Sequence, residues 1–169
     1  MSPRVRVRAF TSADAQAVAR VSVLNGQPDT DSGADPSYLA FLAETGTVVV
    51  AVSAPDEVIA WGAVTATGWG EMLTDLFVHP GWHGRGVGTC VLGHFWPSGS
   101  DKQPRFTFSS RHANALPLYA RAGLNPSWPL LYLSGNPNKL TATAAEVVTQ
   151  TPAGAGAAEK IITLSLIHI

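Results

Sequence analysis

The chain has 169 residues, of which 46% are hydrophobic and 14% charged, and its formal net charge is −1. This composition is typical of a globular domain. It shows no excess of basic residues that would bind a nucleic acid or an anionic membrane, so we expect neither partner. The N-terminus lacks the apolar core of a secretion signal and no run reaches the ~20 apolar residues that span a bilayer, which favours a cytoplasmic location.

The first half of the chain carries the patterns of a strand, two helices and then three strands. Thr11 to Asp14 form a capping-box start for a helix that stops at Asn25-Gly26. Period-two alternation and short apolar runs between turn residues indicate strands. The expected strands cover residues 5–10, 47–53, 58–66 and 71–78, and a second short helix is expected over residues 37–44.

The second half continues with a helix after Gly88, whose buried face is marked by apolar residues at helical spacing. A strand is expected over residues 105–109, and a final strand over residues 130–133. Between them, Asn114 stands at the N-cap of a helix that Gly123 ends. Cys90, the single cysteine, cannot form an internal disulfide, and we expect it to be a buried small hydrophobe rather than a nucleophile.

The segment His79 to Gly88, HPGWHGRGVG, carries the clearest chemical signal. Its last six residues hold three glycines and an arginine, and a glycine-rich turn that opens a helix presents unpaired N–H groups to an anion. A turn that needs glycine only for its backbone angles is the alternative. The segment fits neither nucleotide loop, because no Lys-Ser or Lys-Thr follows the glycines and no G-x-x-G spacing completes the dinucleotide pattern.

A third pattern fits this segment. Residues 83–88, HGRGVG, resemble the Q/R-x-x-G-x-G/A signature of the GNAT superfamily of N-acetyltransferases, with His83 in place of the usual Gln or Arg. The preceding residues 76–80, LFVHP, resemble the strand entry of that family. Residues 115–124, ALPLYARAGL, resemble its second signature, with Tyr119 and Gly123 at the tyrosine and glycine positions. The resemblance covers roughly residues 4–134.

The resemblance implies an α/β (α+β) fold with a mixed, mostly antiparallel central sheet flanked by helices. The implied order is strand, two helices, three strands, helix, strand, helix and one or two final strands. A splay between the fourth and fifth strands would take the pantetheine arm of acetyl-CoA, and Tyr119 would be the general acid toward the coenzyme A sulfur. The implied acetyl-CoA contacts are Leu76, Phe77, Val78, His83, Gly84, Arg85, Gly86, Val87, Gly88, Thr89 and Asn114; no metal is expected.

The sequence leaves the role of Asn114 and the identity of the general base open. Asn114 either caps its helix or contacts acetyl-CoA, while His112 stands where the family usually has an Asn. The general base is Glu71, Asp75, His79 or a water chain, and strand alternation places Asp75 opposite Leu76.

The resemblance implies acetyl transfer to a primary amine of a small molecule or peptide. Acidic residues between the first two helices (Asp29, Asp31 and Asp35) favour a cationic acceptor or simply form a solvated loop. Trp61 and Trp69 either wall the acceptor pocket or pack beneath it. The alternative function is a non-catalytic acyl-CoA-binding module of a tandem acetyltransferase, and the oligomeric state, a dimer included, is left open.

The C-terminal part differs in composition. Residues 1–134 are expected to form the acetyltransferase-like domain, and residues 135–163, rich in Ala, Thr and Gly, a linker or the start of a truncated second region. The last six residues, LSLIHI, resemble the translation of a synthetic adapter, and we interpret residues 164–169 as a non-native tail. A genuine strand or short hydrophobic anchor is the alternative.

Overall fold

A computed structural model describes residues 5–26, 36–97, 103–110 and 112–127. The chain divides into two units, and all the described helices and strands belong to the first, Met1–Pro126. The strand predicted over residues 130–133, the linker over 135–163 and the tail over 164–169 lie outside the described residues.

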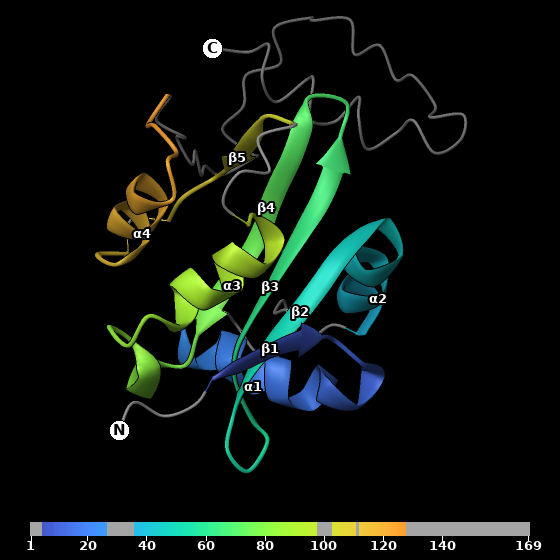
Figure 1. The fold of residues 1–169 in the computed structure, drawn as a ribbon. Coiled ribbons are helices and arrows are strands. Elements are labelled where there is room, and N and C mark those ends of the chain that lie inside the picture. Colours follow the sequence, from blue (N-terminus) through green and yellow to red (C-terminus); the bar gives the residue numbers. More distant parts are fainter. Residues whose placement is uncertain (1–4, 27–35, 98–102, 111, 128–169) are drawn as a thin grey trace, which may run out of the picture. The chain divides into compact units, whose positions relative to one another are not determined.

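The described elements follow the predicted order (Figure 1). The strands are β1 (Arg6–Ala9), β2 (Gly46–Ser53), β3 (Glu57–Thr67), β4 (Gly70–Val78) and β5 (Arg105–Thr107). The helices are α1 (Ala15–Leu24), α2 (Pro36–Thr45), α3 (Val87–Phe95) and α4 (Ala115–Arg121), with short 3-10 turns η1 (Ser12–Asp14) and η2 (Pro80–Trp82). Strand β5 is shorter than predicted. Within the described part of the chain, no helix has the length and apolar character needed to cross a bilayer.

The five strands form one mixed sheet in the order β1-β2-β3-β4-β5. Strands β1 to β4 pair antiparallel, and β4 and β5 pair parallel. The central strands are apolar on both faces, because helices cover both faces. The mostly antiparallel sheet flanked by helices confirms the predicted fold class.

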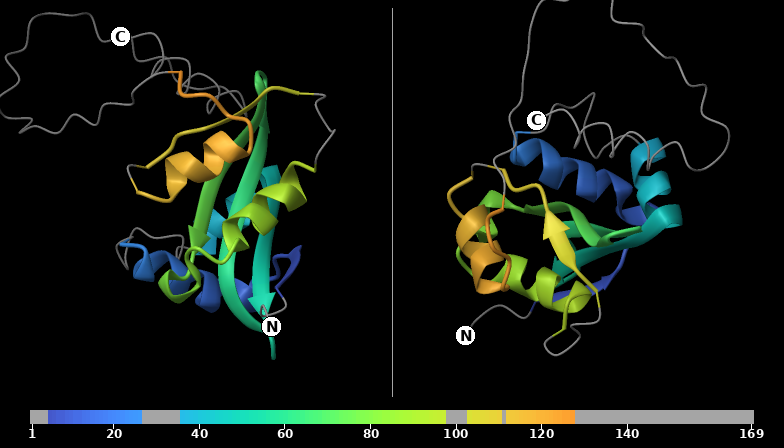
Figure 2. Two further views of the ribbon diagram at one scale, coloured as in Figure 1. Left: turned by 60° about the vertical axis from the view of Figure 1, so that its left-hand side comes forward. Right: turned by 90° about the horizontal axis from the view of Figure 1, so that it is seen from above.

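Helices α1 and α2 lie over one face of the sheet, and α3 and α4 lie over the other (Figure 2). The α1–α2 side is organised around Trp61, which is fully buried and stacks on Phe77 with ring centroids 5.5 Å apart. The Trp61 indole N–H donates to Ser22 Oγ at 3.0 Å, and the Ser22 hydroxyl donates to the Val18 carbonyl at 3.1 Å. Trp61 therefore packs within the core and does not wall a pocket.

Strand β4 carries a β-bulge at Thr74. Ala63 pairs with Asp75 and Val64 pairs with Leu73, so Thr74 is the extra residue on β4. Strand β5 pairs with β4 only over Glu71 to Leu73 and then turns away toward α4 (Figure 1). Among the described strands, the outer edge of β4 after Thr74 has no partner. The splay that the resemblance predicted is therefore present.

Candidate functional site

The turn between β4 and α3 forms a backbone N–H cradle. Gly84 and Gly86 have positive φ values of 72° and 78°, and a Cβ built at either would have no neighbour within 4 Å. The first bond of α3 runs from the Cys90 N–H to the Gly86 carbonyl at 3.0 Å. The N–H groups of Val87, Gly88 and Thr89 precede that bond, so the helix itself gives them no carbonyl partner. Such a terminus suits a diphosphate.

Gly88, whose N–H belongs to the cradle, also has a packing role. A Cβ on Gly88 would lie 3.0 Å from Leu118 Cδ2, so the glycine allows α3 and α4 to approach each other. Cys90 is exposed rather than buried, which makes that prediction wrong. The helical face that packs on the sheet carries Val87 and Val91 instead.

Side chains around the cradle hold its turn in place. Arg85 is exposed, and its guanidinium carbon lies 5.3 Å from the Trp82 ring centroid, which is a cation–π contact. The His79 Nδ1 accepts the Gly81 N–H at 3.0 Å and caps the 3-10 turn η2. The His79 ring is therefore engaged in the turn, while the Arg85 charge stays at the surface beside the cradle.

The unpaired edge of β4 offers a limited set of backbone groups. The His79 N–H donates to the carbonyl of Ile59, a residue of β3, at 2.8 Å. Because hydrogen-bonded pairs alternate along an antiparallel ladder, Phe77 also directs its N–H and C=O toward β3. Leu76 and Val78 direct theirs to the open edge. This corrects the expectation that Phe77 offers backbone bonds to acetyl-CoA.

The Val78 carbonyl is already engaged. It accepts from His83 Nε2 at 2.8 Å and from Asn25 Nδ2 at 3.0 Å. The His83 ring also meets the His112 ring edge-on, with centroids 5.4 Å apart. His83, expected as an acetyl-CoA contact, thus anchors the turn to β4. Among the described residues, the groups left without a partner at this edge are the Leu76 N–H, the Leu76 C=O and the Val78 N–H.

Asn114 stands at the N-cap of α4, as predicted, but its side chain makes no capping hydrogen bond. Its backbone N–H donates to His112 Nδ1 at 3.2 Å, and its side chain is exposed. The sequence left capping and cofactor contact open, and the structure gives no support to capping by the side chain.

Tyr119 of α4 is half-buried against the apolar cluster that contains Leu73 and Leu92. Burial raises the pKa of Tyr119, a hydrogen bond with Thr107 acts in the opposite direction, and the charge of Asp75 raises it further. The phenol is therefore neutral at physiological pH and holds a proton that it can donate.

Asp75 is the titratable group of β4 at the splay. The Tyr38 hydroxyl, from α2, donates to the Asp75 carboxylate at 2.6 Å. Burial raises the pKa of Asp75, and hydrogen bonds from Tyr38 and Thr74 act against that rise. Burial also raises the pKa of Tyr38, as does its bond to Asp75. No sequence pattern pointed to Tyr38, because its partner lies 37 positions away.

The other residues considered from the sequence lie elsewhere. Glu71 is at the start of β4, with its Oε2 3.9 Å from Arg105 Nε. Trp69 is 61% exposed at the β3–β4 turn, so it does not pack beneath a pocket. Asp29, Asp31 and Asp35 lie outside the described residues.

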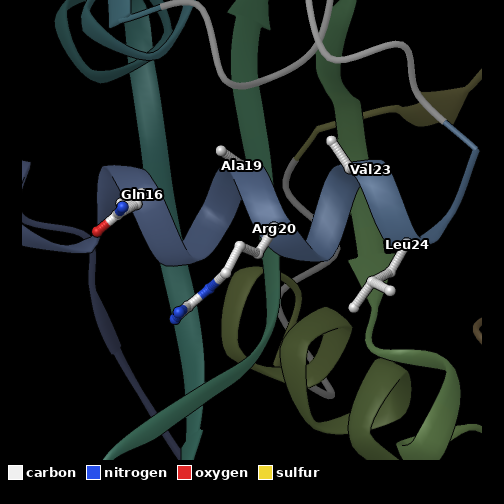
Figure 3. A pocket seen from close by; sticks show the side chains of 5 residues that line it. All are labelled: Gln16, Ala19, Arg20, Val23 and Leu24. Carbon is white, nitrogen blue, oxygen red and sulfur yellow. The ribbon is translucent and has the colours of Figure 1, made fainter.

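A hollow on the surface of α1 is lined by Gln16, Ala19, Arg20, Val23 and Leu24 (Figure 3). None of these residues is among the predicted contacts, and the lining holds no acid–base side chain. The hollow therefore offers no side chain for the acid–base chemistry that the resemblance implies.

No family model matches the chain, and a search of curated proteins found no match. Solved structures do match. The ribosomal-protein-S18-alanine N-acetyltransferase of Escherichia coli aligns with a TM-score of 0.60 and 14% identity over 74% of this chain and 80% of that one.

An acetyltransferase of the GNAT family from Streptococcus pneumoniae aligns with a TM-score of 0.59 and 11% identity, over 79% of this chain and 98% of that one. The chain has the GNAT fold. A Trypanosoma brucei acetyltransferase also aligns, with a TM-score of 0.57 and 16% identity over 78% of this chain and 99% of that one. Likeness at these identities establishes the GNAT fold, and activity has to be argued from the site.

Proposed function

We propose that the protein is an N-acetyltransferase that transfers the acetyl group of acetyl-CoA to a primary amine. The observation that carries the proposal is the unpaired edge of β4 after Thr74, which leads directly into the N–H cradle at the start of α3. An extended thioester with a diphosphate at its far end needs these two features in this order. The GNAT fold supports the same conclusion.

In this proposal the diphosphate lies on the N–H groups of the α3 terminus, where the helix dipole and Arg85 add positive charge. The pantetheine arm pairs with β4 like an added strand, through the Leu76 N–H and C=O and the Val78 N–H. One of these N–H groups also polarises the thioester carbonyl. It stabilises the negative charge that develops on that oxygen when the amine attacks.

The reaction that follows is a direct transfer. The neutral amine attacks the thioester carbonyl carbon, the C–N bond forms, and the C–S bond of the tetrahedral intermediate breaks. Tyr119 gives its proton to the leaving thiolate, and the nitrogen loses a proton as the amide forms. The raised pKa of Tyr119 supports this role, because it keeps the phenol protonated until the thiolate appears.

The test has two stages on the 169-residue chain. Calorimetry with acetyl-CoA measures binding. A thiol-release assay then uses an alanine-first peptide, a lysine peptide with a blocked N-terminus, spermidine and an aminoglycoside. The first peptide is included because the Escherichia coli neighbour is named for alanine acetylation. Binding with amine-dependent thiol release supports the proposal, and binding without release from any amine favours the non-catalytic acyl-CoA-binding module.

A further inference from the structure

Asp75 lies on the α1–α2 face of the sheet, opposite the apolar residues that support the acetyl-CoA edge. Leu76 packs with the clusters under α3, whereas Phe77 packs against Trp61 on the other face. Because side chains alternate along a strand, Asp75 shares the face of Phe77, and its bond to Tyr38 of α2 confirms this. The bulge at Thr74 produces this orientation by separating Asp75 from the face of Leu73.

Partial burial of the Asp75 carboxylate disfavours folding, because it removes a charged group from water. The carboxylate is half-buried, and no Lys or Arg of the described residues forms an ion pair with it. Its described partners are hydroxyl groups, from Tyr38 at 2.6 Å and from the neighbouring Thr74. A partly desolvated carboxylate without a cationic partner, beside an opening in the sheet, is a feature of sites that use the charge.

The two other base candidates on and after β4 do not have this placement. Glu71 lies where β4 and β5 are still paired, near Arg105. The His79 Nδ1 is occupied by the Gly81 N–H. The charge of Asp75 contributes to the raised pKa of Tyr119, so Asp75 is within electrostatic reach of the proposed acid.

We propose that Asp75 is the base that removes a proton from the acceptor, and that Tyr38 is the positioning residue that holds its carboxylate at the splay. This inference rests on the proposed acetyl transfer. The acceptor arrives as an alkylammonium ion, R–NH₃⁺. Its proton passes to the Asp75 carboxylate, which becomes the neutral acid, and the lone pair of R–NH₂ attacks the thioester. Asp75 then returns its proton to water.

The assignment also narrows the acceptor class. A carboxylate in this position both attracts a cation and deprotonates it, which suits alkylamines that are protonated at neutral pH, such as lysine side chains and polyamines. Weakly basic aromatic amines, which are already neutral, gain little from such a base.

The deciding experiment measures kcat/KM for the best amine of the panel against pH in wild type, Asp75→Asn and Glu71→Gln. Asp75→Asn should lower kcat/KM at neutral pH by about 100-fold or more. Its activity should rise about tenfold per pH unit up to the amine pKa, because only the free amine then reacts. Glu71→Gln, a matched carboxylate change on the same strand, should keep the wild-type profile.

Tyr38→Phe tests the positioning role through a different readout. Removal of the hydroxyl removes a hydrogen bond that stabilises the carboxylate form, so the pKa of Asp75 rises. The acid limb of the kcat/KM profile should therefore move to higher pH. An acid limb that stays in place overturns the role of Tyr38.

The possible failures are distinguishable. Calorimetry with acetyl-CoA in the absence of amine confirms that each variant is folded and binds the donor. Thiol release by wild type that is equally fast in Asp75→Asn overturns the base assignment alone. Absence of thiol release by wild type with every amine overturns the proposed function, and the assignment of Asp75 with it.

Discussion

Several polar side chains of this protein are half-buried, and each forms hydrogen bonds with only one or two described partners. Tyr119 depends on Thr107, and Asp75 depends on Tyr38 and Thr74. Loss of a single hydrogen-bond partner in such a place leaves the remaining group unsatisfied, which costs more than the bond itself contributed. Single substitutions are therefore informative at these positions.

Substitution of Tyr119 by Phe removes the phenol and keeps the ring that packs against Leu73 and Leu92. We expect kcat to fall by about 100-fold or more because the leaving thiolate loses its proton donor. The affinity for acetyl-CoA should change little, since the backbone provides the proposed contacts. Steady-state kinetics and calorimetry separate the two effects. Unchanged turnover would remove Tyr119 from the reaction.

Ser22→Ala should destabilise the fold without affecting the site. The substitution leaves the Trp61 indole N–H without its partner in a position with no access to water. The free energy of unfolding in urea should fall by about 1–3 kcal/mol. In a double-mutant cycle with Trp61→Phe, which removes the donor, the combined cost should be less than the sum of the single costs. Strict additivity would argue against this bond.

Residues that act through local sequence were predictable, and those that act through tertiary contacts were not. The alternating spacing of Gly84 and Gly86 in the sequence predicted a glycine-dependent turn, and both residues have positive φ. Tyr38 gave no signal, because its role arises from packing of α2 against β4. Cys90 was misassigned because its helix is apolar on more than one face, so composition does not identify the side that meets the sheet.

At the scale of elements, β4 is the strand on which the site depends. Its inner edge pairs with β3 along its whole length, whereas its outer edge pairs with β5 over only three residue pairs. Neighbouring amides on β4 therefore differ in environment. The Phe77 N–H faces a strand partner, and the N–H groups of Leu76 and Val78 face the splay.

Amide hydrogen exchange tests this difference. Without ligand, the Phe77 amide should exchange slowly and those of Leu76 and Val78 faster. Saturating coenzyme A should slow exchange at Leu76 and Val78 and change Phe77 less, because only the first two gain a partner. Residue-resolved NMR measures all three amides in one experiment. Saturated binding that leaves Leu76 and Val78 unprotected would contradict strand-like docking.

Strand β1 is joined to the start of α1 by a charged contact. Arg8 donates to both carboxylate oxygens of Asp14 at 2.7 and 2.8 Å, and the Thr11 N–H and hydroxyl each donate to Asp14 Oδ2 at 2.9 Å. Asp14 is 6% exposed. The hydrogen bonds from Arg8 are the main cause that lowers the pKa of Asp14 to about 2.

This contact gives stability a defined pH dependence. The pKa of Asp14 in the folded chain lies below its unfolded value, so the stabilisation is complete above the unfolded pKa and is lost as pH falls from about 4 toward 2. The loss should be on the order of 2 kcal/mol. Urea unfolding between pH 7 and pH 2 measures it. Asp14→Asn should be less stable at pH 7 and flatter over that window; an equal slope would exclude Asp14 as the cause.

At the scale of the whole domain, the order of elements followed from local pattern, and the pairing of strands did not. Turn residues and hydrophobic periodicity located the described helices and strands to within a few residues. The register of the sheet depends on contacts between distant segments, so neither the bulge at Thr74 nor the point where β5 leaves β4 could be derived from composition or spacing. The splay was expected only through the GNAT resemblance.

Ligand binding should stabilise the whole domain. Coenzyme A at about 100 times its Kd should raise the free energy of unfolding by about 2.7 kcal/mol. That corresponds to a rise in Tm of about 5–11 °C for a domain of this size class. ATP should give a much smaller rise, because the cradle lacks the lysine of a nucleotide-triphosphate loop. Differential scanning fluorimetry with each ligand checks both expectations.

Gly86→Ala supplies the structural test of this shift. Gly86 has a φ of 78°, which costs about 1–2 kcal/mol for an L-residue, so the substitution distorts the cradle and should weaken the shift caused by coenzyme A. Gly26→Ala is the matched control, because Gly26 has a φ of 85° and equally open surroundings at the end of α1. Gly26→Ala should lower Tm without ligand and keep the full shift with it. If both variants keep the full shift, the diphosphate does not bind on the cradle of α3.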